Sequence, residues 1–531
     1  MNSRFGVLLL LLVMLQQVSV SQEYVLVGWN DLGMHCSNKD FSKMAVLPPF
    51  NNIVAQLIRK SPNHLPQLVT AGFSVEYSIP GNTYSVGKTN FWTYAQQLFG
   101  LSQPLTPNIG LTGKGLTGNL DTIGNHFKAT GIPITPFADN DLVNENPYQL
   151  IHLVARLIAT GDTVAATDVV IPVSNEVGCV QSGCHASETA ILSAHESVPG
   201  FNRTQPILCA TCHASNALGT TGDPEAQSFS YRIHSRHQFI TPTNSLSTCY
   251  KCHPGPNTRC LRDVMGTNTT NPLTCQNCHG TMAQVASSIN SGRRPWLDEP
   301  RCGSTACHGS GHAEEAGKLY RESQGHGGLY CSACHGSPHA ILPTIQSNDN
   351  LQSIRLQGVA GPLRDCNICH STPPTSPGPH GLTYLNTTTA NIQMSTDWNM
   401  VSVPVTVGDS RSTILFPTAT SNAYTYVSAA GYVRKDTLLN RLGYWIKFPS
   451  AQTVSITGFA RLHDTVDVVQ GWNLVGSISV PIQVASIVQM PTGIVASGYY
   501  AFSGSGYIQT NTIEPGKAYW VKVSTSGRLG F

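Results

Sequence analysis

The spacing of the cysteines constrains this chain more than any other feature. The chain has 531 residues and 16 cysteines, and 14 of these cysteines fall into seven segments that each end in Cys-His. Two residues separate the cysteines in five segments, and four residues separate them in the other two. The C-x-x-C-H segments are 209–213, 249–253, 275–279, 331–335 and 366–370, and the C-x4-C-H segments are 179–185 and 302–308.

C-x-x-C-H is the attachment motif of c-type haem. The two thiols form thioether bonds to the porphyrin vinyl groups, and the histidine that follows binds the iron as proximal ligand. The longer spacing is a rarer variant that can do the same. We therefore predict seven covalent haems c. Their thioether residues are Cys179, Cys184, Cys209, Cys212, Cys249, Cys252, Cys275, Cys278, Cys302, Cys307, Cys331, Cys334, Cys366 and Cys369, and their proximal ligands are His185, His213, His253, His279, His308, His335 and His370.

Structural zinc and disulfides are the alternative uses of these cysteines. Zinc does not require a histidine directly after the second cysteine, so the repeated Cys-His dipeptide favours haem over zinc. Only Cys36 and Cys260 lie outside the seven segments. In an exported chain two such thiols favour a disulfide, which would tie the N-terminal domain to the haem region. His35-Cys36 as a metal or haem contact is the alternative.

The sixth ligand of each iron decides between an electron carrier and an open site for a substrate. Seven further histidines lie between 179 and 380, one for each motif, which predicts bis-histidine ligation throughout. Met265 and Met282 are alternative ligands, and His35 or His126 would be candidates if a ligand came from the N-terminal domain or another subunit. His64, His152 and His463 are read as structural or surface residues. The candidate distal ligands are His195, His234, His237, His312, His326, His339 and His380.

Local spacing suggests how some of these histidines are used. Residues 186–197 have a helical pattern, and His195 is too close to His185 to fold back easily onto the same iron, so it is expected to serve a neighbouring haem. His234 and His237 are three residues apart, which places both on one side of a helix. We expect them to reach two adjacent haems.

The stretch from about 255 to 380 resembles a family of exported bacterial multihaem c-type cytochromes. The residues that carry the resemblance are RCLRDVM at 259–265, RRPWLDEPRCG at 293–303, GHGGLYCSACHGSPHA at 325–340 and GPHG at 378–381, with GWNDLGMHC at 28–36 and GKTNFW at 87–92 nearer the N-terminus. This resemblance implies a closely packed chain of haems for electron transfer at or beyond the cell surface, with filament formation in some relatives. Many multihaem enzymes carry C-x-x-C-K, and this chain has no such segment.

The predicted fold is multidomain: a mainly β N-terminal domain, a haem-packed central domain of short helices, and two small all-β C-terminal units. Residues 24–27, 73–77 and 169–172 read as strands, whereas 51–60 and 91–99 read as short helices. Few apolar runs occur in the central region, so haems should replace much of its core, and it should not fold without them. The expected boundaries are a signal peptide at 1–21, the N-terminal domain at 22–172, the haem domain at 173–380, a linker at 381–392 and β repeats at 393–463 and 464–531.

The C-terminal repeat has an offset of 74–75 residues. Trp398-Asn399 recurs as Trp472-Asn473, and the segment YWIKF at 444–448 recurs as YWVKV at 519–523. Each copy has short alternating runs, which predicts two small β units. They resemble paired C-terminal modules of secreted bacterial proteins, and we interpret them as a spacer or surface-contact module.

Composition excludes some functions. Lys and Arg total 31 against 29 Asp and Glu, which argues against a basic nucleic-acid binder. The apolar run from Phe5 to Leu15 is too short to span a bilayer and fits a cleaved signal, so no membrane span is expected afterwards. We predict an exported heptahaem electron carrier at the cell surface, outside the cell or in the periplasm, with other cytochromes, an extracellular acceptor or its own copies as partners. The alternatives are a multihaem oxidoreductase with one open haem, of the nitrite or hydroxylamine type, and a surface adhesion protein.

Overall fold

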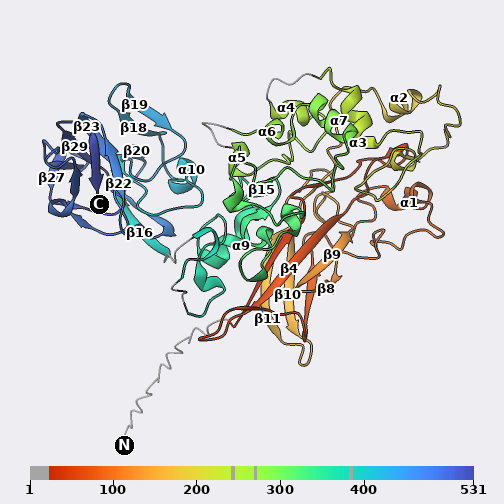
Figure 1. The fold of residues 1–531 in the computed structure, drawn as a ribbon, viewed down its shortest axis with the longest axis horizontal. Coiled ribbons are helices and arrows are strands. Elements are labelled where there is room, and N and C mark those ends of the chain that lie inside the picture. The colour runs from red at the N-terminus through yellow and green to blue at the C-terminus, as the bar shows by residue number, and fades with distance from the viewer. Residues whose placement is uncertain (1–22, 241–244, 268–271, 373, 375, 382–386) are drawn as a thin grey trace, which may run out of the picture.

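The computed structural model describes residues 23–240, 245–267, 272–372, 374, 376–381 and 387–531. The expected signal peptide lies outside the described residues. Figure 1 shows the N-terminal strands and the short helices of the central region in one body, with the C-terminal β region beside it. Within the described residues, no helix has the length and apolar character needed to cross a membrane. Most of the regular elements in the described residues are strands of several separate sheets, so the structure is mainly β and multidomain.

The N-terminal domain consists of two sheets. In the first sheet the order is β1-β4-β9-β8 with β5 added at β4, and in the second it is β11-β10-β6-β7. One α-helix, α1 (Phe91–Phe99), lies where a helix is expected. The strands are β1 Tyr24–Asn30, β4 Asn51–Arg59, β5 Gln67–Leu68, β6 Phe73–Ser78, β7 Gly118–Asn119, β8 Asp121–Ile123, β9 His126–Ile132, β10 Leu150–Leu157 and β11 Thr163–Val170.

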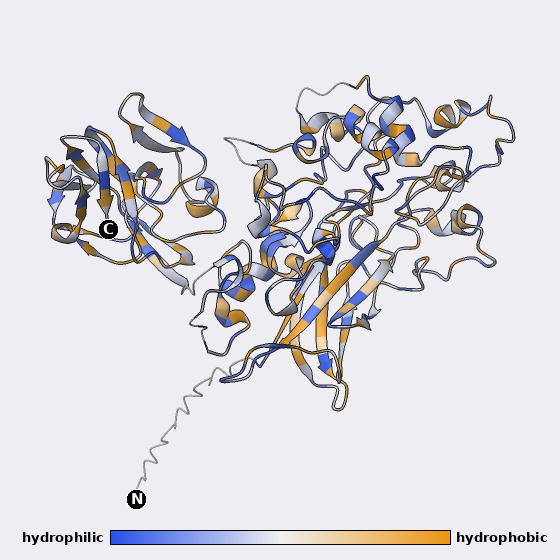
Figure 2. Ribbon diagram, viewed as in Figure 1, coloured by the Kyte–Doolittle hydropathy of each residue, from blue (hydrophilic) through white to orange (hydrophobic). Residues whose placement is uncertain are grey.

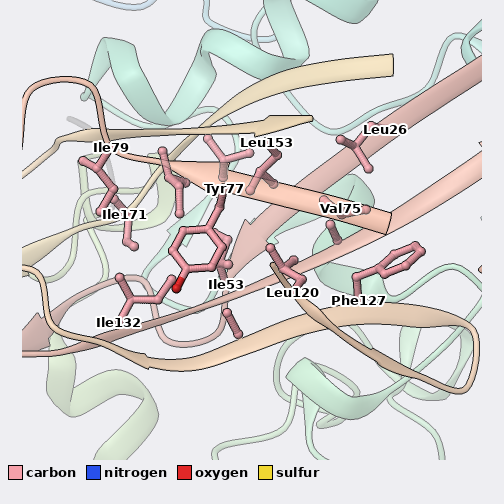
Figure 3. Packing of buried hydrophobic residues seen from close by; sticks show 14 of the residues in the cluster. Leu26, Ile53, Val75, Tyr77, Ile79, Leu120, Phe127, Ile132, Leu153 and Ile171 are labelled. Carbon is pink, nitrogen blue, oxygen red and sulfur yellow. The ribbon is translucent and has the colours of Figure 1, made fainter. Parts of the chain in front are cut away.

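The two sheets enclose one hydrophobic core, part of which is drawn in Figure 3. Along β6 buried and half-buried residues alternate, so that Val75 and Tyr77 point into the core with Leu153 and Phe127. Figure 2 shows apolar residues along the long strands of this domain. This alternation is the pattern of a strand with one buried face, and it explains why 73–77 could be recognised as a strand.

The expectation of a short helix at 51–60 is wrong, because Asn51–Arg59 is the strand β4. β4 lies between β1 and β9, and all but its last residue are buried. A strand that is covered on both faces reads as a continuous apolar run, which periodicity cannot distinguish from a buried helix. The central position of this strand in its sheet therefore explains the error.

The central region is built from short helices and loops. Two of its helices, α6 (Cys275–His279) and α8 (Cys331–His335), each consist of one C-x-x-C-H segment. The helical pattern at 186–197 forms a shorter helix than expected, α2 (Glu188–Ser193). The other elements are α3 Phe229–Arg236, α4 Leu246–Cys249, α5 Val264–Thr267, α7 Met282–Asn290, α9 Ser347–Gln357, the two-stranded hairpin β14 Gly336–Ser337 and β15 Ala340–Ile341, and 3-10 turns at Cys209–Thr211, Ser310–His312, Tyr320–Glu322, His326–Gly328, Cys366–Ile368 and Pro379–Gly381.

Short parallel strand pairs join the central region to the N-terminal domain. β2 (His35–Cys36) pairs with β12 (Val173–Ser174), and β3 (Met44–Ala45) pairs with β13 (Ile207–Leu208). The first residues of the expected haem domain thus belong to a sheet of the N-terminal domain. A fully buried Arg262 adds a second connection, since it binds the carboxylate of Asp349 within the central region. Its guanidinium also donates to the carbonyl oxygen of Gly33.

The two C-terminal repeats have the same fold. Their four-stranded sheets have equivalent orders, β17-β20-β18-β19 and β23-β29-β26-β27. The first repeat also contains β16 (Thr387–Met394), which pairs with β21 (Gln452–Phe459) and begins inside the stretch expected to be linker. The remaining elements are β17 Asp397–Val401, α10 Ser412–Leu415, β18 Ala423–Val427, β19 Gly431–Lys435, β20 Tyr444–Phe448, β22 Thr465–Val468, β23 Gly471–Val475, β24 Ile482–Gln483, a 3-10 turn at Val484–Ser486, β25 Val488–Met490, β26 Tyr499–Phe502, β27 Tyr507–Thr510, β28 Thr512–Ile513, β29 Tyr519–Val523 and β30 Gly527–Gly530.

Candidate functional site

Each of the seven motif histidines faces a second histidine of the central region. The second members are the seven histidines that lie between residues 179 and 380 but outside the motifs. We number the pairs in the chain order of the motifs and give the distance between ring centroids. Site 1 is His185 with His237 (6.1 Å), site 2 His213 with His195 (6.2 Å), site 3 His253 with His234 (6.2 Å), site 4 His279 with His339 (6.0 Å), site 5 His308 with His312 (6.3 Å), site 6 His335 with His380 (6.1 Å) and site 7 His370 with His326 (6.0 Å).

The ring centroids within each pair are farther apart than those of two imidazole rings in contact. The rings of His312 and His380, which belong to different sites, stack at 4.7 Å with an angle of 22° between their planes. Two imidazoles that bind opposite sides of one metal ion, with each nitrogen about 2 Å from it, have ring centroids about 6 Å apart. The seven pairs therefore have the spacing of two axial ligands of a single ion.

The C-x-x-C-H segments adopt one tight turn that brings their three functional side chains together. In three of them the amide of the histidine donates to the carbonyl of the first cysteine: His213 to Cys209 at 3.0 Å, His253 to Cys249 at 2.9 Å and His370 to Cys366 at 2.8 Å. In the other two segments the turn is the helix α6 or α8. Residues three and four positions apart lie on one side of such a turn.

The two longer segments close in the same way. The amide of His185 donates to the carbonyl of Cys179 at 3.1 Å, and the amide of His308 donates to that of Cys302 at 3.2 Å. The two additional residues lie inside the turn. The hydrogen bond from the amide of the histidine to the carbonyl of the first cysteine is the same as in the shorter segments. The C-x4-C-H segments are thus local equivalents of C-x-x-C-H.

Several of these imidazoles are oriented through Nδ1. His234 Nδ1 lies 2.7 Å from the carbonyl of Ser230, and His237 Nδ1 lies 2.8 Å from that of Ile233. His213 Nδ1 lies 2.7 Å from the carbonyl of Gln227. A carbonyl only accepts, so Nδ1 carries the proton in each case and Nε2 keeps a free lone pair. This is the arrangement usual for histidines that bind metals.

Burial favours the neutral form of several histidines of the seven sites. It lowers the pKa of His253 to about 4 and that of His279 to about 4. Burial also lowers the pKa of His234 and His335. Because only the neutral imidazole can donate its lone pair to a metal, these side chains are in the ligating form at neutral pH.

All sixteen cysteines are free thiols in the structure. Burial, together with the neighbouring Cys260 thiol, raises the pKa of Cys36 to about 12. Cys260 Sγ also lies 3.6 Å from Nδ1 of His339, the second histidine of site 4. Cys36 and Cys260 are therefore neighbours, and the disulfide between them stays a prediction.

The histidines outside the seven pairs have other surroundings. His35 is buried, with Nε2 2.9 Å from Asp31 and its ring against Phe50. His126 Nδ1 lies 3.3 Å from the hydroxyl of Tyr330. His152 pairs with Asp168, whereas His64 and His463 are exposed. Met265 and Met282 lie in α5 and α7, and each motif histidine already faces a histidine.

A cleft of about 520 Å³ in the central region is lined by four cationic and four acidic side chains. Sequence reasoning did not identify it, although its first residues belong to the segment RRPWLDEPRCG at 293–303. Its acidic residues are Asp298, Glu299, Glu314 and Glu322. Its cationic residues are Arg293, Arg294, Arg301 and Lys318.

In the described part of the chain, no group of three or more His, Cys, Asp or Glu side chains is placed to hold a metal ion. The histidine pairs accordingly offer two protein ligands each. No protein-family model, curated protein or solved structure matches this chain.

Proposed function

We propose that this chain is an exported electron carrier that holds seven covalent c-type haems, each between two histidines. One observation carries the proposal: every motif histidine has its own second histidine at axial-ligand spacing, and none of the fourteen is shared. Cysteine spacing alone would account for the attachment of haem. The pairing accounts in addition for the sixth ligand.

The donor set at each site fits a haem. The two imidazoles of each pair would hold a haem iron between them. In each motif the second cysteine directly precedes the histidine and the first lies four or six residues before it, and these two thiols would form the thioether bonds. Haem bound at these sites would supply one-electron redox chemistry.

The protein itself contributes orientation, charge and exclusion of substrate. The Nδ1 hydrogen bonds of His213, His234 and His237 fix the face that each ring presents. The basic side chains of the cleft at Arg293 and Arg301 would balance haem propionates. Two histidines at each iron would leave no position for a substrate, which favours an electron carrier over a nitrite- or hydroxylamine-converting enzyme. Other cytochromes or an extracellular acceptor are the proposed partners.

The test is a haem count and a spin-state measurement on the purified holoprotein. Mass spectrometry should give seven covalent haems per chain, and electron paramagnetic resonance should give low-spin iron only. Carbon monoxide, nitrite and hydroxylamine should leave the optical spectrum unchanged. A high-spin iron that binds one of these ligands would favour the enzyme, and a chain without haem would refute the proposal.

A variant pair makes the test specific for the second histidine. Replacing His326 by alanine should convert the haem of site 7 to a high-spin form that binds carbon monoxide, while the covalent haem count stays at seven. His64→Ala is the matched control, because His64 is exposed and outside the pairs. If His326→Ala remains entirely low-spin, His326 is not the axial ligand of site 7.

A further inference from the structure

We infer that Cys260, one of the two cysteines outside the haem motifs, is a positioning residue for His339, the second histidine of site 4. Its sulfur accepts a hydrogen bond from Nδ1 of this ring, and the bond orients the ring and lowers the potential of the haem that would bind there. The inference rests on the proposed function, in which Nε2 of His339 binds the iron.

His339 lies in a turn, where its own backbone offers no acceptor to its ring. It belongs to the two-residue connection between β14 and β15 and has a φ of +62°. In the helix α3, by contrast, Nδ1 of His234 and of His237 lies beside the carbonyl of the residue four positions earlier. Such a carbonyl is present only where a preceding helical turn exists. The acceptor for His339 therefore has to come from another segment of the chain.

Cys260 supplies this acceptor from 79 residues away. Its Sγ lies 3.6 Å from Nδ1 of His339. In a neutral imidazole that binds iron through Nε2, the proton is on Nδ1, so the ring donates and the sulfur accepts. The contact thus takes the place that a backbone carbonyl takes for His234 and His237.

Backbone contacts hold the two segments side by side. The amide of Arg262 donates to the carbonyl of His339 at 3.0 Å, and the amide of Ile345 donates to the carbonyl of Arg262 at 3.0 Å. Asp263 and Thr344 form an antiparallel bridge. The cysteine and the histidine are therefore brought together by the main chain on both sides, so their contact is part of the fold of this region.

Cys36 lies close to the same segment. Ser174, its partner in the pair of β2 and β12, has its hydroxyl oxygen 2.9 Å from that of Thr258, two residues before Cys260. A disulfide between the two cysteines stays a prediction, and any substitution of Cys260 would also remove it. The experiment therefore needs a variant of each cysteine.

The hydrogen bond has a defined effect on the iron. An acceptor at Nδ1 makes the imidazole a more basic ligand. A more basic ligand stabilises the ferric form, so the potential of the haem falls. Removal of the sulfur should accordingly shift the potential of site 4 to a more positive value and leave the other six sites where they are.

The experiment is a redox titration of the full-length holoprotein, followed by optical absorbance and electron paramagnetic resonance. His339→Ala identifies the signal of site 4, because that iron loses its sixth ligand and becomes high-spin. Cys260→Val fills the space of the thiol but cannot accept a hydrogen bond, and we expect it to shift the potential of this one haem to a more positive value. Cys260→Ser restores an acceptor and should reverse most of the shift. Cys260→Ala replaces the valine variant if that protein attaches fewer than seven haems.

Three results would overturn the inference. The potential of site 4 could stay unchanged in Cys260→Val, or Cys260→Ser could shift it as far as Cys260→Val does, which would assign the effect to packing. Cys36→Ser keeps the sulfur of Cys260 and should leave site 4 unchanged. An equal shift in Cys36→Ser would assign the effect to a disulfide.

The covalent haem count of the unsubstituted protein separates these outcomes from a failure of the proposed function. With seven haems and an unmoved site 4, the role of Cys260 is refuted and the electron carrier is not. With fewer than seven haems, the proposed function is refuted, and the inference with it.

Discussion

The central region and the flanking β regions are stabilised in different ways. The N-terminal domain and the two C-terminal repeats each have a hydrophobic core of their own. In the described part of 179–381, by contrast, every core cluster is shared with the N-terminal domain, through residues such as Ala333, Ile368 and Leu208. Burial of apolar surface is the main favourable term in folding, so the central region needs another apolar component, and seven haem plates would supply it.

The largest expected effect follows from withholding haem. If the full chain is produced in cells that lack the c-type haem attachment system, we expect the central region to lose its fold completely and the C-terminal repeats to keep theirs. Limited proteolysis with peptide mapping measures this, with cleavage concentrated between 179 and 381. The holoprotein is the control. Resistance of the central region to proteolysis in the haem-free chain would contradict this prediction, because it would show that the region has a core independent of haem.

The sequence predicted the two kinds of region unequally well. Alternation identified β6, and the 74–75-residue offset predicted two matching units, which the equivalent sheet orders confirm. β4 was missed because it is buried on both faces. For the site, the residues could be selected from the motifs and from the number of spare histidines, but their pairing could not, apart from the suggestions for His195 and for α3.

For most sites the pairing was out of reach because it depends on contacts between distant segments. His326 faces His370 and His339 faces His279, and neither spacing follows from a turn or a helix. The packing of the central region on the N-terminal domain fixes these positions, as the parallel pair of β2 and β12 illustrates. Local patterns carry no information about such a pairing.

The connection between the two regions can be weakened at Arg262. This side chain is fully buried and binds Asp349 and the carbonyl of Gly33. Arg262→Ala leaves the Asp349 carboxylate buried without its partner, which typically costs about 3–5 kcal/mol of unfolding free energy. Denaturant unfolding of the holoprotein, followed by haem absorbance, measures the loss.

The double variant Arg262→Met with Asp349→Leu is the control for Arg262→Ala. It removes both charges and keeps their volume, so it should regain most of the lost stability. Equal losses in the single and double variants would mean that the ion pair does not act as a unit.

Two cavity-creating substitutions, one in the N-terminal core and one in the core of the first C-terminal repeat, test whether these cores support the central region differently. Leu153 in the N-terminal core and Ile446 in the C-terminal core are both fully buried. Replacing either by alanine should lower the unfolding free energy of its own domain by about 2–5 kcal/mol. Only Leu153→Ala should shift the denaturation midpoint seen by haem absorbance, because the N-terminal domain shares clusters with the central region. A similar shift for Ile446→Ala would show that the C-terminal repeats also support the haem sites.

The smallest effect is expected where the two repeats meet. Ser402 and Ser477 occupy equivalent positions 75 residues apart, are buried, and have their hydroxyl oxygens 2.9 Å apart. Ser402 also donates to the carbonyl of Lys517, and Ser477 accepts from the amide of Gly516. Each replacement removes buried hydrogen bonds. Ser402→Ala and Ser477→Ala should therefore each lower the free energy of unfolding by about 1 kcal/mol.

Denaturant unfolding of the C-terminal repeats, followed by tryptophan fluorescence, measures these losses, and the exposed Ser505→Ala is the control. The double variant should lower the free energy of unfolding by less than the sum of the two single losses, because both substitutions remove the same contact. Additive losses would mean that the two repeats are stabilised independently. Such a result would extend the contrast with the central region to the single repeat. Each repeat would then be stabilised by its own core, whereas most of the histidine pairs of the central region join distant segments.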